Sequence, residues 1–260
     1  MIRSRALGCL ALLVSALVPP VAARADYHVL GALRIEPAPE WGRRASPLAI
    51  PREWWFGRDA MSFATQDWRY VFDKSRGRIL VINEKDHYVV AVAMTADTPD
   101  IVDPGYLEAL GRTQLFGTVA KSLQSRTVLD AECPGTALSE WMVSEGQHVY
   151  DRDRTIYACA GVPFDWRMFR DLSTWMVSFF NPQMAYFGGL RSIEGFPLAE
   201  TDVYTRNTLH VSYGVEVTAI YEATPPPGIY ELPAGYARRD KLTQRDIQAM
   251  RQIQYLAYSY

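Results

Sequence analysis

The residues that most often carry catalysis are present in this chain, but their spacing matches no catalytic or metal-binding motif that we sought. Its four histidines, His28, His87, His148 and His210, lie far apart. The H-E-x-x-H pattern of zinc peptidases and the G-x-S-x-G turn of serine hydrolases are both missing from the sequence. We therefore expect surface or partly buried imidazoles, no metal, no cofactor and a protein that is not an enzyme.

Paired carboxylates occur twice, as Asp130 with Glu132 and as Asp151 with Asp153. A two-residue spacing places both members of a pair on one face of a strand, where acid-base or calcium chemistry could use them. The second pair alternates with arginines, however, and lacks the glycine of a calcium-binding loop. The pattern favours a solvated turn over a reactive site.

Two cysteines, Cys133 and Cys159, lie 26 positions apart in the body of the chain. In an exported protein such a pair favours a disulfide, which would stabilise the fold by roughly 3 to 4 kcal/mol. A redox-active or metal-binding thiol pair is the alternative. It is disfavoured because the spacing is not C-x-x-C and no histidine lies close to either cysteine.

Residues 1–25 are typical of an export signal. Arg3 and Arg5 precede an apolar run over residues 6–18 that is too short to span a bilayer, and residues 23–25 have the small-x-small pattern of a cleavage site. We therefore expect cleavage after Ala25 and a periplasmic protein, which disfavours kinases, ATPases and soluble dehydrogenases. Lipid attachment at Cys9 is the alternative, but most of the apolar run follows Cys9 and cleavage would discard it.

Cleavage would also change the charge balance. It removes three arginines and no acids, so 27 − 3 = 24 basic residues would face 29 acidic ones, a net charge of −5. A nucleic-acid partner would require a basic stripe, so this balance argues against one. No later segment has the roughly 18 uninterrupted apolar residues of a membrane-spanning helix.

The segments that must position any site begin with a predicted antiparallel meander. Trp68, Tyr70 and Phe72 alternate with Arg69 and Val71, and further short strands are predicted over residues 79–82 and 88–94, separated by polar turns. Residues 126–159 also have a β-like pattern, and residues 208–221 are predicted to form a long bent strand. Residues 26–51 are expected to be an extended proline-containing arm with at most one strand, over residues 27–35.

Three helices are predicted. Asp103 and Pro104 favour the start of a helix that continues through Leu123. Asp165 begins a second helix, which ends at residues 181–182. Thr243 begins a third, with Asp246 as its capping-box partner.

Several short motifs occur in a characteristic order. Residues 70–73 and 77–83 form one hairpin signature, residues 195–198 a turn, and residues 215–220 and 230–236 a closing signature. This arrangement resembles the LolA/LolB-like superfamily of periplasmic lipoprotein carriers, and in particular an exported branch of that fold without an assigned activity. The resemblance implies an α+β fold, in which a curved antiparallel half-barrel sheet has helices packed on its concave face. Because carriers of this fold hold acyl chains, it also implies an apolar cavity and lipid or lipoprotein handling in the envelope.

Eight side chains are the candidates for a hydrophobic ligand pocket, since they project from the predicted meander, the β-like middle and the second helix. They are Trp68, Tyr70, Phe72, Trp141, Phe169, Leu172, Met176 and Phe179. The same side chains could instead fill an ordinary core, and the sequence leaves both possibilities open.

The predicted organisation is a signal peptide over 1–25, the arm over 26–51, a LolA-like half-barrel domain over 52–242 and a C-terminal helix over 243–260. The expected function is binding of a lipid, acyl chain or acylated protein in the envelope. The alternative is a structural or interaction protein that docks on an envelope partner through the arm and the terminal helix, without a small ligand.

Overall fold

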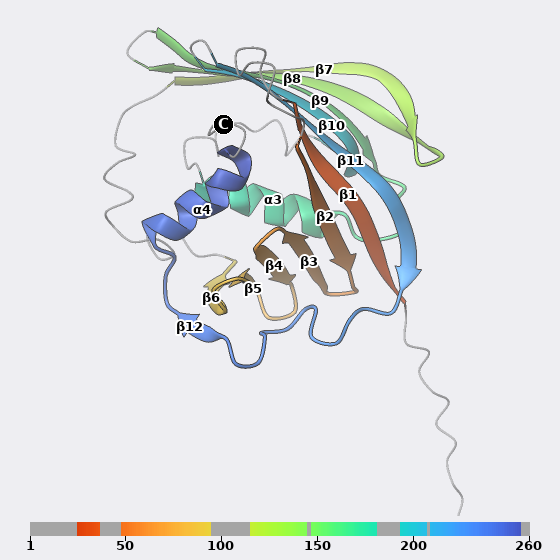
Figure 1. Cartoon of the computed structure of the whole chain (residues 1–260). Coiled ribbons are helices and arrows are strands. Elements are labelled where there is room, and N and C mark those ends of the chain that lie inside the picture. The colour runs from red at the N-terminus through yellow and green to blue at the C-terminus, as the bar shows by residue number, and fades with distance from the viewer. Residues whose placement is uncertain are drawn as a thin grey trace, which may run out of the picture.

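Twelve strands join edge to edge in one open sheet, in the order β12-β6-β5-β4-β3-β2-β1-β11-β10-β9-β8-β7 (Figure 1). This computed structural model describes residues 25–36, 48–94, 115–144, 147–180, 193–206 and 209–255. Neighbouring strands are antiparallel, except that the short β12 runs parallel to β6. Residues 1–24 of the predicted signal peptide and residues 37–47 lie outside the described residues.

The strands fall into three groups along the chain. The first group is β1 (Asp26–Glu36), β2 (Leu48–Phe56), β3 (Ala60–Thr65), β4 (Trp68–Asp73), β5 (Arg78–Asn83) and β6 (Tyr88–Ala93). The second is β7 (Leu115–Val128), β8 (Ala131–Ser144) and β9 (Gln147–Cys159). The third is β10 (Phe196–Arg206), β11 (Leu209–Ala223) and β12 (Ala237–Arg239). The predicted meander is therefore confirmed as β4 to β6, and the predicted long strand as β11.

Two helices complete the described fold, α3 (Arg167–Phe180) and α4 (Gln244–Tyr255). The predicted α+β class, with helices packed on the concave face as a second layer, is wrong, because the described chain is mostly β. Among the helical side chains that the structure describes, four belong to the buried core, which is built chiefly from strands: Met168, Leu172, Ile247 and Met250. One face of a large antiparallel sheet can supply most of a core, so few helical side chains are needed against it.

The helix predicted from Asp103 through Leu123 is also wrong over residues 115–123, the part that the structure describes. Residues 95–114 lie outside the described residues, and residues 115–128 form strand β7, which pairs with β8 along its length. The apolar residues of this segment lie at near-helical spacing, but most of β7 is exposed and therefore shows no buried face. An exposed edge strand lacks the two-residue alternation that would have distinguished it from a helix.

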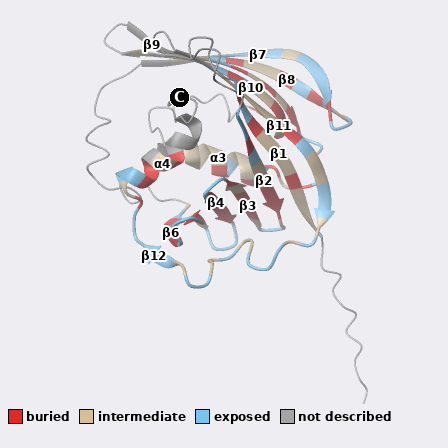
Figure 2. Ribbon diagram, in the orientation of Figure 1, coloured by how far each residue is buried: buried red, intermediate tan, exposed pale blue. Residues whose placement is uncertain are grey.

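Both faces of the meander are covered, which explains its nearly continuous burial (Figure 2). One face of β4, with Trp68, Tyr70 and Phe72, points into the main core. The other face carries Val71, which packs with Leu80, Ile82 and Val89 beneath Tyr230, Leu232 and Tyr236 of the segment after β11. The chain therefore passes back across the outside of its own meander before β12 forms.

The predicted start of α3 near Asp165 and the predicted capping box of α4 are confirmed. Asp165 accepts a hydrogen bond from the backbone N–H of Arg167 at 3.2 Å. At α4 the backbone N–H of Thr243 donates to the Asp246 carboxylate, and the backbone N–H of Asp246 donates to Thr243 Oγ1. Asp246 also accepts a hydrogen bond from the buried Tyr88 hydroxyl at 2.6 Å, so the cap fixes α4 to β6.

The predicted disulfide is confirmed. Cys133 and Cys159 form a bridge with Cα atoms 4.8 Å apart. They continue the β8–β9 register beyond the pair Gly135 and Tyr157, so the bridge closes the end of this ladder. Both cysteines are buried, with 0% and 4% of their surface exposed.

Candidate functional site

Half of the predicted pocket residues lie in the middle of the packed core. Trp68, Tyr70, Phe72 and Leu172 are each exposed over no more than 2% of their surface. The Tyr70 ring lies 5.9 Å from Phe63, and burial raises the pKa of the Tyr70 hydroxyl well above its ordinary value. These side chains stabilise the sheet and leave little space among them for a ligand.

The remaining predicted pocket residues are less uniform. Phe169 and Met176 of α3 are partly buried and pack against the same core, with Phe169 4.9 Å from the Phe196 ring. Trp141 of β8 lies elsewhere, across Gly117 of β7, where a Cβ atom on the glycine would come within 2.1 Å of the indole. The side chain of Phe179 lies outside the described residues. The structure thus brings the β4 and α3 residues together and leaves Trp141 apart.

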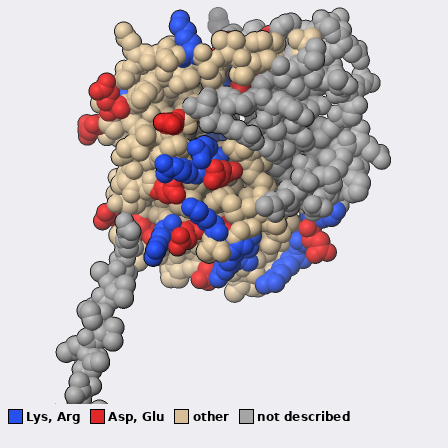
Figure 3. Space-filling view, turned by 180° about the vertical axis from the view of Figure 1, so that it is seen from behind, with Lys and Arg blue, Asp and Glu red and all other residues tan. Residues whose placement is uncertain are grey.

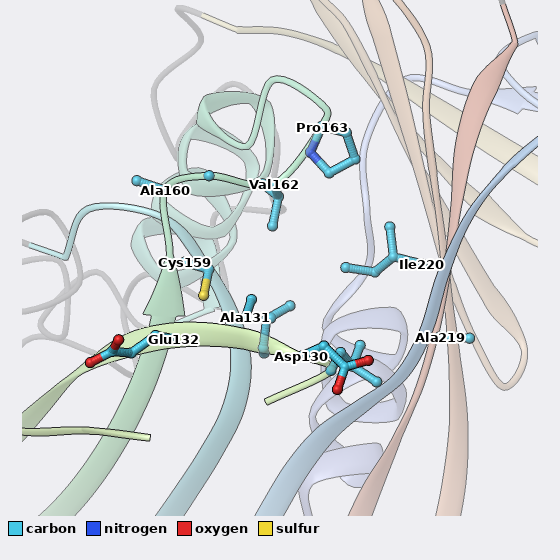
Figure 4. A pocket seen from close by; sticks show the side chains of 12 residues that line it. Asp130, Ala131, Glu132, Cys159, Ala160, Val162, Pro163, Ala219 and Ile220 are labelled. Atoms are coloured by element: carbon cyan, nitrogen blue, oxygen red, sulfur yellow. The ribbon is translucent and has the colours of Figure 1, made fainter. Parts of the chain in front are cut away.

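A cleft of about 540 Å³ lies at a different place, where the β7–β8 turn, the segment after β9 and strand β11 meet. Figure 4 shows Val162 and Ile220 pointing toward one another across this space. Most of the side chains that line it are apolar or small. The complete set is Leu129, Asp130, Ala131, Glu132, Cys159, Ala160, Gly161, Val162, Pro163, Leu198, Ala219 and Ile220.

Burial divides this cleft into a floor and a rim. Leu198 and the disulfide-bonded Cys159 form the floor, at 1% and 4% exposure. Leu129 lies on the rim and is 42% exposed, although it is a large apolar residue. Leu129 and Asp130 both have positive φ angles, 48° and 62°, because the β7–β8 hairpin turns tightly at these two positions. A tight turn thus holds an apolar side chain at the mouth of the cleft.

Sequence reasoning missed this cleft because its lining comes from several separate segments that meet only in the folded chain. One signal was available, since Leu129 is an apolar residue in a hairpin turn, where polar residues and glycine are usual. Of the paired carboxylates, Asp130 and Glu132 lie on the exposed rim. Asp151 and Asp153 lie in strand β9 rather than in the predicted turn, with exposed side chains.

A second group of polar residues crosses strands β8 to β10. Arg152 donates from Nε to both carboxylate oxygens of Asp202 at 2.9 Å, and Arg154 donates to Glu200 at 2.9 Å. Glu140 is 2% exposed, and its Oε2 atom lies 3.8 Å from Arg152 Nη1. Burial is the main cause that raises the pKa of the Glu140 carboxyl, and the two arginines oppose it only in part.

His28 is the described histidine with the most contacts. Its ring stacks on Trp55 at 4.0 Å, and Nδ1 lies 2.7 Å from the Tyr221 hydroxyl. Nε2 lies 2.8 Å from Glu53 Oε1 but outside the hydrogen-bonding direction. This matches the expected partly buried imidazole. Within the described residues, no group of three or more His, Cys, Asp or Glu side chains could hold a metal ion.

Charged side chains of both signs lie on the face of the molecule opposite to the one seen in Figure 1. Figure 3 shows lysine and arginine interspersed with aspartate and glutamate over the described part of this face. Oppositely charged side chains also pair within the described chain, as Arg69 does with Glu84 at 2.6 Å. The described part of this face therefore carries no basic stripe of the kind that binds nucleic acid.

Comparison with known proteins gives no family assignment from sequence: no protein-family model and no curated protein matches this chain. Three solved structures share features of the fold. A DUF1329 family protein from Desulfovibrio piger is 7% identical, covers 81% of this chain and 91% of its own, and has a TM-score of 0.31.

The other two structures are similarly distant. A domain provisionally assigned as an outer membrane lipoprotein-sorting protein, from Vibrio parahaemolyticus, is 6% identical, covers 78% and 87% of the two chains and has a TM-score of 0.30. A β-barrel-like DUF1849 protein from Brucella abortus is 10% identical, covers 78% and 100%, and has a TM-score of 0.27. Likenesses this distant do not assign the chain to a family.

Two further findings bear on the setting of the protein. The buried disulfide is consistent with an exported protein, because such bridges persist in oxidising compartments. Neither described helix is both long enough and apolar enough to cross a membrane.

Proposed function

We propose that this protein is a non-enzymatic periplasmic binding protein that holds the hydrophobic part of a lipid, an acyl chain or an acylated protein in the cleft beside the disulfide. The observation that carries the proposal is the lining of that cleft. Its floor and walls are apolar or small, and among the described residues that line it the charged groups are the carboxylates of Asp130 and Glu132 on the rim. This lining favours burial of apolar surface over polar recognition.

The size of the cleft supports the same conclusion. Its volume of about 540 Å³ lies within the roughly 300–1,000 Å³ common for small-molecule sites. Each buried methylene group contributes about 0.8 kcal/mol, so six to ten of them would supply about 5–8 kcal/mol before the cost of ordering the chain. Such binding is tolerant of chain identity, because it depends on buried area rather than on directed hydrogen bonds.

The proposal that the protein is not an enzyme also rests on this lining. The residues that surround the described cleft include no histidine, serine, threonine, lysine or arginine. The cysteine among them is held in the disulfide. The rim carboxylates lie on an exposed turn and at the start of β8, where solvent screens them. The cleft therefore offers apolar contact and no paired nucleophile and base.

Binding of a dansyl-labelled fatty acid to the purified protein tests this function. Val162→Asp places a charge against the apolar wall, and Ala160→Trp fills the exposed side of the cleft with bulk. Val203→Asp is the matched control, since Val203 lies outside the cleft on β10 and is 42% exposed. We expect both cleft variants to weaken binding about tenfold or more, which is 1.4 kcal/mol, while the control binds like the wild type.

Equal binding by the wild type and both cleft variants would remove the assignment of the cleft. Because Val162 also packs against the core, its thermal unfolding is measured in parallel. Ala160 is exposed, so its variant retains the test if the first one unfolds. Native mass spectrometry of protein purified from the periplasm identifies the ligand class, and a bare polypeptide in that experiment would argue against a resident lipid.

A further inference from the structure

The two edges of the twelve-stranded sheet are formed by strands of very different length. At one edge the short strand β12 pairs with β6, and its residues Ala237 to Arg239 lie opposite Tyr88 to Val90. At the other edge lies β7, a strand of 14 residues that pairs only with β8 among the described strands. A long, uncovered edge strand presents a row of free backbone donors and acceptors to any chain that can add a strand.

Residues 118–122 of β7 are exposed on both faces of the sheet. Residues 118–122 are five consecutive exposed positions, although neighbouring residues in a strand point to opposite faces. Val119 is 56% exposed, the largest fraction among the exposed large hydrophobic side chains of the described chain. Figure 2 shows exposed positions along the visible part of β7 and β8, in contrast to the buried meander. Both faces of this segment therefore meet solvent, and no described strand pairs with its outer edge.

We infer that β7 is a homodimer interface, in which β7 of a second copy pairs antiparallel to it about a two-fold axis at Ala120. The exposed run is centred on Ala120, so this axis covers the same five residues of both copies. A closed two-fold dimer is the commonest symmetric assembly, and it would join the two sheets into one. The inference concerns β7 and does not depend on ligand binding in the cleft.

The residues brought together by this axis are complementary. Val119 of one copy would lie opposite Lys121 of the other, so the aliphatic stem of the lysine covers exposed methyl groups and no lysine faces a lysine. Thr118 would lie opposite Ser122, a pairing of hydroxyl side chains that is favourable across strands. If the two-fold axis lay at Lys121 instead, the Lys121 side chains of the two copies would lie opposite each other and repel.

The same register explains an otherwise odd pairing at the start of β7. Gly117 lies under the Trp141 indole, and both residues are only half-buried. In the proposed dimer Leu123 of the second copy lies opposite Gly117. Its side chain would then pack against the indole that covers the glycine. An aromatic ring over a strand glycine commonly protects such a position.

Cysteine cross-linking tests the register. Directly opposite Cα atoms in an antiparallel pair lie about 4.5–5.5 Å apart, within the range of a disulfide, whereas diagonal neighbours lie about 7–8 Å apart. Under mild oxidation we expect Ala120→Cys to give a disulfide-linked dimer. Val119→Cys and Lys121→Cys should each cross-link poorly alone, and an equal mixture of the two should give the heterodimer.

The oligomeric state of the wild type is measured by analytical ultracentrifugation. We expect a concentration-dependent dimer, and Ala120→Lys should raise its dissociation constant about tenfold, because two lysines would meet at the axis. Val203→Lys is the matched control, since Val203 is an exposed valine on β10 away from this edge, and it should leave the dimer unchanged. A monomeric wild type at every concentration, or equal cross-linking at positions 119, 120 and 121, would overturn the inference.

Discussion

Loss of the disulfide tests most directly how the long strands are stabilised. The bridge joins Cys133 at the start of β8 to Cys159 at the end of β9, and both sulfurs are buried. The perturbation with the fewest side effects is reduction, because the two thiols keep nearly the volume of the bridge. The double variant Cys133→Ala with Cys159→Ala removes the bridge permanently, but it also leaves a small cavity.

The magnitude follows from the loop that the bridge closes. The cysteines are 26 residues apart, and loop-closure entropy for a loop of this length corresponds to about 3.5 kcal/mol at 25 °C. For a domain of this size, each kcal/mol shifts the melting temperature by about 2–4 °C. We therefore expect reduction to lower the melting temperature by about 7–14 °C. The alanine double variant should lose somewhat more, because of the cavity.

Urea unfolding of the oxidised and reduced protein provides the assay. In the entropic description the bridge acts on the unfolded chain, so the reduced protein should expose more surface on unfolding and show a larger m-value. The buried bridge is expected to resist reduction in the folded state, so the protein is reduced while unfolded and then refolded with reductant present.

One result would refute this reasoning. If the reduced protein kept its free energy of unfolding within about 1 kcal/mol of the oxidised protein, loop closure could not be the source of the stabilisation. A loss in the alanine variant without a loss on reduction would instead assign the effect to packing of the two sulfurs.

Three further predictions concern single side chains. Asp246→Ala should lower the free energy of unfolding by about 2 kcal/mol, because it removes a helix cap and the acceptor of the buried Tyr88 hydroxyl. Urea unfolding measures this loss, and an unchanged midpoint would contradict the prediction. Gly117→Ala should cost about 1–3 kcal/mol, because the new methyl group meets the Trp141 indole; most of this loss should disappear in a Trp141→Ala background, and an equal loss there would exclude the clash as its cause. The carboxyls of Asp73 and Glu140 should act in opposite directions with pH. Burial raises the pKa of the Asp73 carboxyl, but hydrogen bonds from neighbouring groups outweigh it, so this pKa falls below the usual 3.8. The ionised carboxyl therefore stabilises the fold above that pH, and the stabilisation is lost as the pH falls through the lowered pKa. Asp73→Asn should remove this stabilisation. Burial raises the pKa of Glu140 above the usual 4.5, so its ionisation costs stability as the pH rises, and Glu140→Gln should be neutral or stabilising at pH 7; parallel slopes of stability against pH for the two variants would contradict this.

Much of the fold could be predicted from local sequence. The alternation of Trp68, Tyr70 and Phe72 predicted β4, because one face of that strand is buried in the core. The capping residues Asp165 and Thr243 predicted the starts of both described helices, since a cap acts only on the backbone of the next few residues. These features succeed because their causes lie within one turn or one strand.

Strand β7 shows where local sequence fails. Its apolar residues lie at helix-like spacing, and its exposed first half leaves no alternation of buried and exposed residues to detect. Pairing with β8 determines its conformation, and the hairpin turn at Leu129 and Asp130 brings the two strands together. The α+β prediction came from the resemblance to the LolA/LolB-like carriers, and it failed because most of the described chain forms strands.

The sequence by itself determined the meander, the helix caps and the disulfide of this protein, together with a signature of export. Only the tertiary structure decided which apolar residues fill the core and which surround open space. Tyr70 and Leu198 have equally buried side chains, yet only Leu198 forms the floor of the cleft. The cleft exists because distant segments meet at the end of the β8–β9 ladder without filling the space between them. Its shape depends on chain path and packing, which no local pattern of residues encodes.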